Sequence, residues 1–542
     1  MEVDRLPELR WEAPGSAVSY RVFLGAGALP KEPLALTSQR SWEPELPLDS
    51  RAEYLWRVDW LAEDGTVVEG ETWSFRTAVQ ILVPGDWPTI GGALKAASDG
   101  GTILVRPGIY REAIDFEGRS VTLRSLEGPE ATILEGDGSG PVVMFQTGEG
   151  PNARLEGFTI RGGESESGGG ILCRDASPTI RGNVVTANRA REGGGLYCER
   201  SSAKIEGNRI EANVADAAGG GLFASECRLQ IAGNDIIGNE VEGPGEILVT
   251  GGGAALFRSE DRLEDNRIEA NTVSATDAEG GSGLTALGAG LYLQGNLEAK
   301  PARLIGNRIR GNEAVAEGRA IVTAAGGGVW CLNTVLDANR IEDNAVRASS
   351  TPVLEEDEEQ PFAGAGGLYL GAGSRSTNDI IVRNTVHLGA TEPSAPLAGA
   401  RGAGVLVEEA LLVHGTIAFN EIETTLEGVR RGTGLFGREA IVINTILWQN
   451  GAAAKELEGE ALDVKYCLTT EPFPGEGNKS GDPELRSDTN YHLKQTSPAL
   501  DAATSLVPGG PPKRDFDGDR RPQDGNRDGQ EAPDIGADER TE

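Results

Sequence analysis

The chain has 542 residues, too many for one compact core, and 76 of them are Gly, roughly twice the usual share. Its 50 basic and 84 acidic residues give a formal net charge of −34, which repels phosphate backbones and excludes general nucleic-acid binding. No run of about 18 apolar residues occurs, so we expect no transmembrane segment. No basic stretch followed by an apolar one opens the chain, so no signal peptide is visible.

Five cysteines are spread along the chain, at Cys173, Cys198, Cys227, Cys331 and Cys467. An odd number without CxxC spacing predicts neither a disulfide framework nor a zinc site. Cys173, Cys198 and Cys331 are the last residues of the segments GGGILC, GGGLYC and GGGVWC. We therefore expect cysteine to serve as a small buried hydrophobe at equivalent positions of a repeat.

Residues 1–79 differ in composition from the rest, since they hold five of the eight tryptophans. Alternating runs at 19–24, 54–60 and 72–77 predict antiparallel strands with one buried face. The segment LPLDSRAEYLWRV (46–58) resembles the corner between strands E and F of a fibronectin type III domain, with Tyr54 as the corner tyrosine. The resemblance implies a small β-sandwich, and we expect it to act as a spacer.

Residues 80–100 predict a short helix that covers the open end of the next domain. Thr89 has the position of an N-cap, and Ile90, Ala93, Leu94 and Ala97 form an i, i+3, i+4, i+7 stripe. Such a helix would protect an otherwise unpaired sheet edge.

From about Leu155 the chain repeats the unit apolar-x-x-Asn-x-apolar-x-x-Asn, followed by a loop and a Gly-rich strand. The first Asn occurs at Asn183, Asn208, Asn234, Asn266, Asn307, Asn339, Asn384, Asn420 and Asn444. The second occurs at Asn188, Asn213, Asn239, Asn271, Asn312 and Asn344. Variable spacing between fixed anchors indicates a common coil that carries loops of different length.

The unit contains short β-type runs and no helix-period stretch, so about 25 residues are expected to make one coil of three short strands. This pattern resembles the right-handed parallel β-helix of the pectate-lyase-like superfamily, over residues 80–475. The resemblance implies an all-β, right-handed parallel β-helix solenoid preceded by a small β-sandwich. We expect the asparagines to stack at the turns, where Asn tolerates left-handed backbone geometry.

The strand after each Gly-rich element carries an outward column of aromatic residues. Its members are Tyr197, Phe223, Phe257, Tyr292, Trp330 and Tyr369, followed by Leu406 and Phe436. This column is the predicted ligand-binding face, because aromatic rings stack on sugars, or else an assembly face. The alternative, which we favour, is that the insertions before this strand fold back and cover it. The insertions are 240–250, 272–288, 313–325, 345–364, 387–401 and 423–431, and the EEDEE segment at 355–359 predicts a solvated tip.

A second outward column combines arginines with glutamates two residues later. Its members are Arg209, Arg267, Arg308 and Arg340 with Glu211, Glu269 and Glu342. A groove for acidic sugars would use the arginines without the glutamates, so the pattern predicts a surface ion-pair lattice.

The resemblance implies what an active site would need: a Lys or Arg base, often with Ca²⁺, in a lyase, or clustered aspartates in a glycosidase. Between residues 101 and 450 the only lysines are Lys204 and Lys300, and His387, His414 and His492 are scattered. No lyase, polygalacturonase or epimerase signature is present. We therefore predict a non-catalytic protein for binding or display, with a polysaccharide or other glycan as first candidate. The alternative is a polysaccharide lyase or hydrolase with its site among the long loops.

Residues 476–542 form an acidic, Pro- and Gly-rich segment. NYHL (490–493), SPALDA (497–502) and DIGADE (534–539) resemble the terminal segment of secreted or surface-anchored bacterial β-helix proteins. The resemblance implies an extracellular or cell-surface location and a structural role for His492.

The same segment predicts a Ca²⁺ site, because carboxylates alternate along it. The expected ligands are Asp515, Asp517, Asp519, Asp524, Asn526 and Asp528. The last three match the first half of an EF-hand loop, but position twelve is Ile535, so Asp534 or Glu531 would have to complete it. The alternative is a solvated, metal-free acidic loop.

Overall fold

The computed structural model describes the chain except for a set of short segments. These are residues 1, 4–6, 13–16, 46–47, 50–51, 78–79, 244–247, 277–282, 297, 319–321, 351–361, 391–398, 425–429, 452–454 and 542. The acidic segment predicted at 355–359 therefore lies outside the described residues. Two compact units are present: Met1–Pro107 with Arg119–Leu126, and Gly108–Gly118 with Glu127–Glu542. No described helix is long and apolar enough to cross a membrane.

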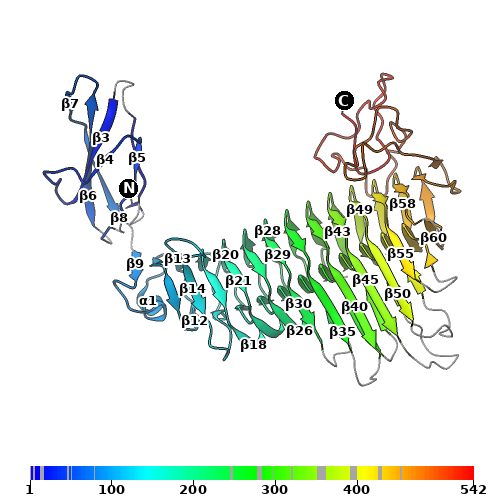
Figure 1. The fold of residues 1–542 in the computed structure, drawn as a ribbon, viewed down its shortest axis with the longest axis horizontal. Helices are drawn as coiled ribbons and strands as arrows, with labels where there is room; N and C mark the ends of the chain where they lie inside the picture. The colour runs from blue at the N-terminus through cyan, green and yellow to red at the C-terminus, as the bar shows by residue number, and fades with distance from the viewer. Residues whose placement is uncertain are drawn as a thin grey trace. The chain divides into compact units, whose positions relative to one another are not determined.

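The first unit opens with an antiparallel sheet (Figure 1). Its main strands are β3 (Ala17–Ala26), β4 (Ala35–Thr37), β6 (Glu53–Ala62), β7 (Val67–Val68) and β8 (Thr72–Thr77), and β1 (Glu2–Val3) pairs with β8. The pair β2 (Leu9–Arg10) and β5 (Ser41–Trp42) contributes Leu9 to the same apolar core. The Tyr54 hydroxyl accepts the Asp49 N–H at 3.0 Å, a contact that suits the corner role, and the fibronectin-like assignment stays a prediction.

The predicted helix is present as α1 (Ile90–Ala96), between β9 (Gln80–Val83) and β10 (Thr102–Val105). Thr89 is its N-cap, and the Thr89 Oγ1 accepts the Gly92 N–H at 3.1 Å. Ile90, Ala93 and Leu94 are buried, as the stripe predicts. The helix packs against β9 and β10, which pair in parallel.

The second unit is a stack of coils whose strands form three parallel sheets, and the all-β solenoid prediction is confirmed. The first sheet contains β16 (Arg154–Glu156), β20 (Thr179–Arg181), β24 (Lys204–Glu206), β28 (Gln230–Ala232), β33 (Arg262–Glu264), β38 (Ala302–Ile305), β43 (Thr334–Asp337), β48 (Arg375–Thr377), β53 (Leu411–Val413), β58 (Ile441–Ile443) and β61 (Asp463–Lys465). The second contains β11 (Gly108–Tyr110), β14 (Thr132–Glu135), β17 (Thr159–Arg161), β21 (Val184–Thr186), β25 (Arg209–Glu211), β29 (Asp235–Ile237), β34 (Arg267–Glu269), β39 (Arg308–Arg310), β44 (Arg340–Glu342), β49 (Ile380–Val382), β54 (Thr416–Ala418), β59 (Ile446–Trp448), β62 (Leu468–Thr469) and β63 (Lys479–Ser480). The third contains β12 (Ile114–Asp115), β15 (Val143–Phe145), β19 (Ile171–Arg174), β23 (Leu196–Glu199), β27 (Leu222–Ser225), β32 (Ala254–Ser259), β37 (Leu291–Gly295), β42 (Val329–Leu332), β47 (Leu368–Leu370), β52 (Val405–Glu408), β57 (Leu435–Arg438) and β60 (Leu457–Glu460).

Stacked asparagines form two buried ladders, as predicted, but their membership differs from the prediction. In each step the Asn side-chain amide donates to the Oδ1 of the next Asn, at 2.8–3.1 Å. The first ladder runs Asn183, Asn208, Asn234, Asn266, Asn307, Asn339 and ends on Asp379. The second runs Asn188, Asn213, Asn239, Asn271, Asn312, Asn344, Asn384, Asn420, Asn450 and ends on Glu456.

Asn384, Asn420 and Asn444 were therefore assigned to the wrong column. The first two belong to the second ladder, and Asn444 contacts His414 and the carbonyl of Thr504 instead. The expected left-handed backbone at the ladder asparagines is also wrong. The positive φ falls on the residue before the ladder position, such as Ala187 at 53° and Ala212 at 52°. The ladder selects Asn for its amide and not for its backbone conformation.

The Gly-rich elements follow from this amide stack. A Cβ on Gly221 would lie 2.6 Å from the Gly253 carbonyl oxygen and 3.0 Å from the Asn239 Nδ2. A side chain there would collide with both the next coil and the second ladder. Glycine is required where the coil turns into the third sheet.

The predicted insertions form a fourth, lateral sheet of strands that leave each coil and return to it (Figure 1). The outgoing strands are β18 (Glu164–Ser167), β22 (Arg189–Glu192), β26 (Val214–Ala218), β30 (Glu240–Glu242), β35 (Thr272–Thr276), β40 (Glu313–Gly318), β45 (Ala345–Ser350), β50 (Thr385–Ala390) and β55 (Glu421–Thr424). The returning strands are β31 (Leu248–Thr250), β36 (Leu284–Leu287), β41 (Val322–Ala325), β46 (Phe362–Gly364), β51 (Gly399–Arg401) and β56 (Arg430–Arg431). Small buried residues such as Ala275, Ala286 and Ala324 fill the space between them, which explains the Ala-rich composition of these insertions.

The predicted Arg–Glu lattice is present on the second sheet. Arg209 pairs with Glu211 at 2.6 Å and Arg267 with Glu269 at 3.1 Å. Glu342 has only 1% of its side chain exposed and contacts the guanidiniums of Arg308, Arg340 and Arg383. Burial alone would raise the pKa of Glu342, but the three guanidiniums outweigh it and hold the pKa below its ordinary value.

The C-terminal segment packs on the outer face of the second sheet. Its buried residues Leu485, Tyr491, Leu493, Ala499, Leu500, Ile535 and Ala537 contact Ile380, Val382, Ala418, Ile446 and Leu468. A buried ion pair joins Arg521 to Glu539 at 3.0 Å. The Nε2 of His414 accepts the Asn444 amide at 2.9 Å, so its Nδ1 donates to the carbonyl of Asp534 at 3.1 Å. Burial holds the pKa of His414 well below its ordinary value and keeps the ring neutral.

Candidate functional site

The aromatic ladder lies on the third sheet, and most of the predicted column is in register. Tyr197 pairs with Phe223, Tyr292 with Trp330 and Trp330 with Tyr369 on neighbouring strands. The rings of Tyr292 and Trp330 are stacked at 4.5 Å, and those of Trp330 and Tyr369 at 5.1 Å. Leu406 and Phe436 continue the column, as predicted.

The predicted position of the ladder residue on β32 is wrong by two residues. Ala255 and not Phe257 is the partner of Phe223 and Tyr292 in the ladder register. Phe257 lies two residues further on the same strand, and its ring still bridges the gap, at 5.4 Å from Phe223 and 5.0 Å from Tyr292. The next residue, Arg258, has φ +50° and lies at a register shift between Phe257 and Ser259.

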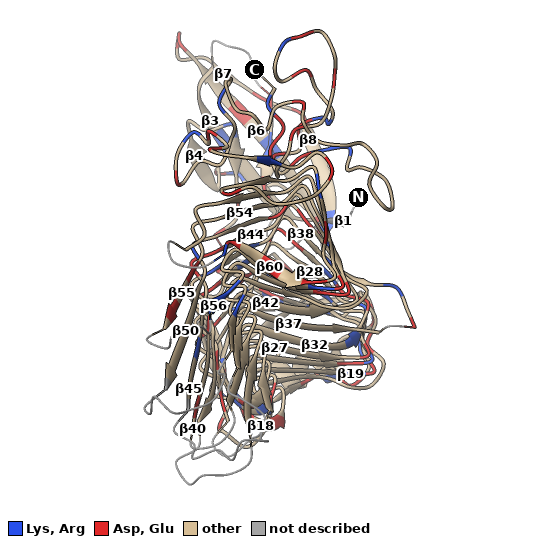
Figure 2. Ribbon diagram, turned by 90° about the vertical axis from the view of Figure 1, so that its right-hand side faces the viewer, with Lys and Arg blue, Asp and Glu red and all other residues tan. Residues whose placement is uncertain are grey.

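The lateral sheet packs against part of the ladder, so the favoured interpretation holds for part of its length. Tyr197, Phe223 and Tyr292 are buried and pack with Ala218 of β26, with Leu287 of β36 beside them. Figure 2 shows the third sheet (β27 to β60) directly beside the lateral strands, with few charged residues along it. Phe257, Trp330 and Tyr369 stay half-buried.

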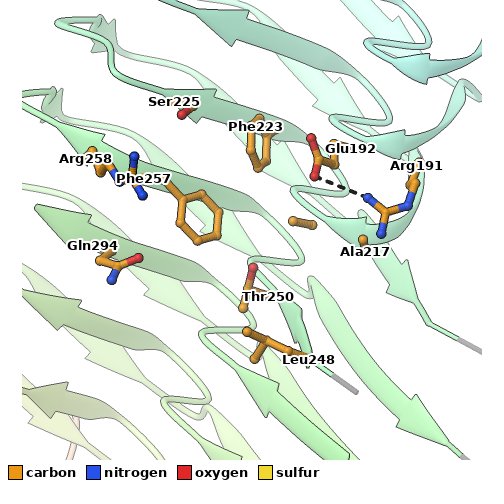
Figure 3. Close-up of a pocket in the computed structure, with 11 residues that line it drawn as sticks. Arg191, Glu192, Ala217, Phe223, Ser225, Leu248, Thr250, Phe257, Arg258 and Gln294 are labelled. Carbon is orange, nitrogen blue, oxygen red and sulfur yellow. Dashed lines mark hydrogen bonds and ion pairs between the residues drawn. The ribbon is translucent and has the colours of Figure 1, made fainter. Parts of the chain in front are cut away.

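One cavity of about 450 Å³ opens where the returning strand β31 meets the third sheet (Figure 3). Phe223 and Phe257 form its apolar wall, and Leu248 and Thr250 of β31 lie opposite. Its polar lining consists of Arg191, Glu192, Ser225, Arg258 and Gln294. The cavity therefore combines two aromatic rings with hydrogen-bonding groups of both kinds.

Three charged side chains, Arg191, Glu192 and Arg258, line this cavity. Arg191 lies 3.5 Å from Glu192, and Arg258, whose side chain is 74% exposed, lies 3.7 Å from Glu226. Burial raises the pKa of Glu192, Arg191 opposes that shift, and Glu199 and Glu166 add to it. Among the described residues that line the cavity, Glu192 carries the one carboxyl group.

A second polar group lies at the other end of the ladder. The Tyr369 hydroxyl donates to Glu408 at 2.7 Å, and Glu408 also pairs with Arg438 at 2.9 Å. Arg401 lies over the rings of Phe362 and Phe436, at 5.9 and 4.9 Å from their centres.

The six predicted calcium ligands are not gathered around one point. Asp515 is buried, and its carboxylate accepts the N–H groups of Asp517, Asp519 and Glu539. Asp524 accepts the N–H groups of Asp528 and Gly529, and Asn526 accepts that of Asp528. In the described part of the chain no three of these carboxylates converge within 4.8 Å. Binding of Ca²⁺ by this segment stays a prediction.

Arg191, Glu192 and Leu248 line the cavity although no sequence motif points to them. They lie on lateral strands, whose path back to the coil depends on insertions of unequal length. All five cysteines are buried and free, which agrees with the predicted apolar role.

The fold defines a parallel β-helix with a lateral sheet that borders an aromatic ladder. A family model described as "right handed beta helix region" matches residues 142–423, and the chain belongs to this family. No curated protein matches the chain.

Three solved structures share low similarity with the chain. A family 28 exopolygalacturonase from Yersinia enterocolitica is 10% identical with a TM-score of 0.30, covering 89% of this chain and 98% of that one. The PL6 family alginate lyase AlyGC is 9% identical with a TM-score of 0.19, covering 72% and 84%. The pectate lyase PelI from Erwinia chrysanthemi, in complex with tetragalacturonic acid, is 11% identical with a TM-score of 0.12, covering 85% and 97%.

Proposed function

We propose that this protein binds a polysaccharide, outside the cell or at its surface, in the cavity beside the aromatic ladder. The observation that carries the proposal is the pairing of two aromatic rings, Phe223 and Phe257, with polar groups around one open cavity. A sugar ring has an apolar face and a rim of hydroxyl groups, so it can use both kinds of surface together. The proposed location rests on the terminal motifs at 490–493, 497–502 and 534–539.

The size of the cavity supports a short segment of a glycan chain. About 450 Å³ lies within the range of small-ligand sites, roughly 300–1,000 Å³. Gln294 and Ser225 offer a neutral amide and a hydroxyl, while Arg191, Arg258 and Glu192 offer charged partners. The half-buried rings of Trp330 and Tyr369 continue the apolar surface along the third sheet.

Phe257→Leu and Arg258→Ala are expected to weaken glycan binding about tenfold each, which corresponds to about 1.4 kcal/mol. Leu keeps apolar volume but removes the ring, and Arg258 is exposed, so the melting temperature is expected to change little. A glycan array would identify the ligand, and calorimetry would then measure Kd for each variant.

Phe473→Ala, a half-buried ring between β62 and β63, serves as the matched control. Tyr292→Ala is expected to lower the melting temperature, because Tyr292 is buried. Unchanged Kd values in both cavity variants, or a wild-type protein that ignores a broad glycan panel, would contradict the proposal.

A polysaccharide hydrolase or lyase is the second candidate, and Glu192 is the observation that favours it. A carboxyl group whose pKa is raised by burial is suited to act as a general acid. Release of reducing ends from the bound glycan, lost in Glu192→Gln while binding is retained, would establish an enzyme. If the wild type binds the glycan and releases no reducing ends, the enzyme candidate is excluded and glycan binding alone is supported.

A further inference from the structure

Three side chains with metal-ligating atoms meet in the C-terminal segment, outside the cavity described above. The Nδ1 of His492 lies 2.8 Å from an oxygen of Asp538 and 3.4 Å from an oxygen of Asp517. All three ligand atoms lie within 4.8 Å of one another. Among the described residues this is the one such group of three or more.

We propose that His492, Asp517 and Asp538 bind a divalent transition metal such as Zn²⁺. The bond from Zn²⁺ to an imidazole nitrogen or a carboxylate oxygen is about 2.0–2.2 Å, so neighbouring ligand atoms around a tetrahedral ion lie about 3.3–3.6 Å apart. The 3.4 Å separation between Nδ1 and Asp517 already fits, and the 2.8 Å hydrogen bond between Nδ1 and Asp538 would open by about 0.5 Å. A cation could therefore enter the group with small side-chain movements.

The donor set identifies the class of metal. The imidazole nitrogen of His492 distinguishes this group from an ordinary cluster of surface carboxylates. Imidazole suits Zn²⁺, Co²⁺ and Ni²⁺, while Ca²⁺ takes six to eight oxygen ligands and gains nothing from a nitrogen. Asp517 and His492 are 40% and 42% exposed, so water can occupy the remaining positions around the ion.

The ligands come from three separate parts of the segment, and each is held in place by its neighbours. The second oxygen of Asp538 accepts the Leu493 N–H at 3.0 Å, which orients the carboxylate from behind. The buried Asp515 accepts the N–H groups of Asp517 and Glu539, at 3.0 and 2.9 Å. The Phe516 N–H donates to the carbonyl of Ala537 at 3.0 Å. A metal here would join chain segments at 492, 517 and 538 that already pack together.

Two carboxylates that face one imidazole also carry an electrostatic cost in the absence of a cation. The imidazole can give its Nδ1 proton to only one of them, and the other carboxylate remains beside a like charge. A divalent ion contacts all three ligands at once and removes that repulsion. The metal site is independent of the proposed glycan function.

The test uses the full-length protein after treatment with a chelator. Calorimetry with Zn²⁺ is expected to give one ion per chain, and Co²⁺ is expected to give visible absorption bands typical of a nitrogen-containing site. His492→Ala and Asp517→Asn are each expected to weaken Zn²⁺ binding at least tenfold and to change the Co²⁺ spectrum. Asp517→Asn is isosteric and Asp517 is half-exposed, so this variant is expected to fold. It tests Zn²⁺ binding if His492→Ala does not fold.

His387→Ala is the matched control, because His387 pairs with Glu423 at 2.9 Å and belongs to a different surface. It is expected to leave Zn²⁺ affinity unchanged, as is Asp519→Asn within the same segment. The proposal is overturned if the wild type does not bind Zn²⁺ at millimolar concentration, or if Asp517→Asn binds with unchanged affinity. Binding of Ca²⁺ in preference to Zn²⁺, with no effect of His492→Ala, would also overturn it and would favour the oxygen ligands Asp524, Asn526 and Asp528.

Discussion

Asn307→Ala is expected to lower the free energy of unfolding by about 3–5 kcal/mol, since an unmade buried hydrogen bond costs about 1–3 kcal/mol. Asn307 is 1% exposed, and its Oδ1 accepts both the backbone N–H and the side-chain amide of Asn266. Its own amide donates to the Leu263 carbonyl and to Asn339, each at 3.0 Å. Alanine removes the acceptor of the Asn266 backbone N–H and the donor to the Leu263 carbonyl, while the Asn339 Oδ1 keeps the backbone N–H of residue 307.

Urea unfolding followed by circular dichroism measures the loss, and Asn266→Ala is expected to behave alike. Asn152→Ala provides the control, because Asn152 is exposed in a turn outside both ladders. Equal stability of Asn307→Ala and Asn152→Ala would mean that the ladder contributes nothing to folding.

Asp379→Asn is expected to stabilise the protein by up to about 4 kcal/mol at pH 9, because one pKa unit corresponds to 1.36 kcal/mol. Asp379 ends the first ladder, where it accepts the amide of Asn339 at 2.9 Å and lies 2.5 Å from the Ser376 hydroxyl. Burial raises its pKa from 3.8 to about 7, and these hydrogen bonds reduce the shift only in part. Asparagine keeps the acceptor oxygen and removes the charge.

The sign of the pH dependence follows from the raised pKa. Between pH 4 and pH 7 the folded state holds a proton on Asp379 that the unfolded state releases. The protonated Asp379 side chain therefore contributes fully to the free energy of unfolding below pH 4, and this contribution is lost as the pH rises through about 7. The advantage of Asp379→Asn should grow over that interval and be small at pH 4.

Unfolding curves at several pH values test this prediction, with the exposed Asp488→Asn as control. The free energy of unfolding of Asp379→Asn should still depend on pH in part, because burial also raises the pKa of Asp261 to about 7. A variant that is no more stable than the wild type at pH 9 would show that the carboxylate is tolerated in the ladder.

Much of the fold could be predicted, because one coil imposes the same residue types again and again. Inward apolar positions, stacked asparagines and close-packed glycines each have a local physical cause. The same regularity explains the errors: Asn384 and Asn420 have the spacing of the first ladder but occupy the second, five residues further along the coil. A sequence read in one dimension cannot assign such a column once insertions change the spacing.

The candidate site was less predictable than the fold. The aromatic column follows from a period of two along each strand, except where the register shift after Phe257 displaces the alignment. Arg191, Glu192 and Leu248 reach the cavity only because the outgoing and returning strands pack face to face. That packing depends on long-range contacts between small residues such as Ala275 and Ala286, which carry no distinctive local pattern.

Every amide of an Asn ladder donates in the same direction, so the two columns are polar along the coil axis. Each column ends on an acidic side chain, Asp379 or Glu456, whose oxygen accepts the last amide donor. Inside a column all steps are chemically alike. Removal of residues 209–234, one whole coil, would delete one Asn from each ladder and present Asn208 to Asn266 and Asn188 to Asn239 with the same donors and acceptors. The solenoid can therefore be shortened or lengthened by whole coils without any new side-chain chemistry.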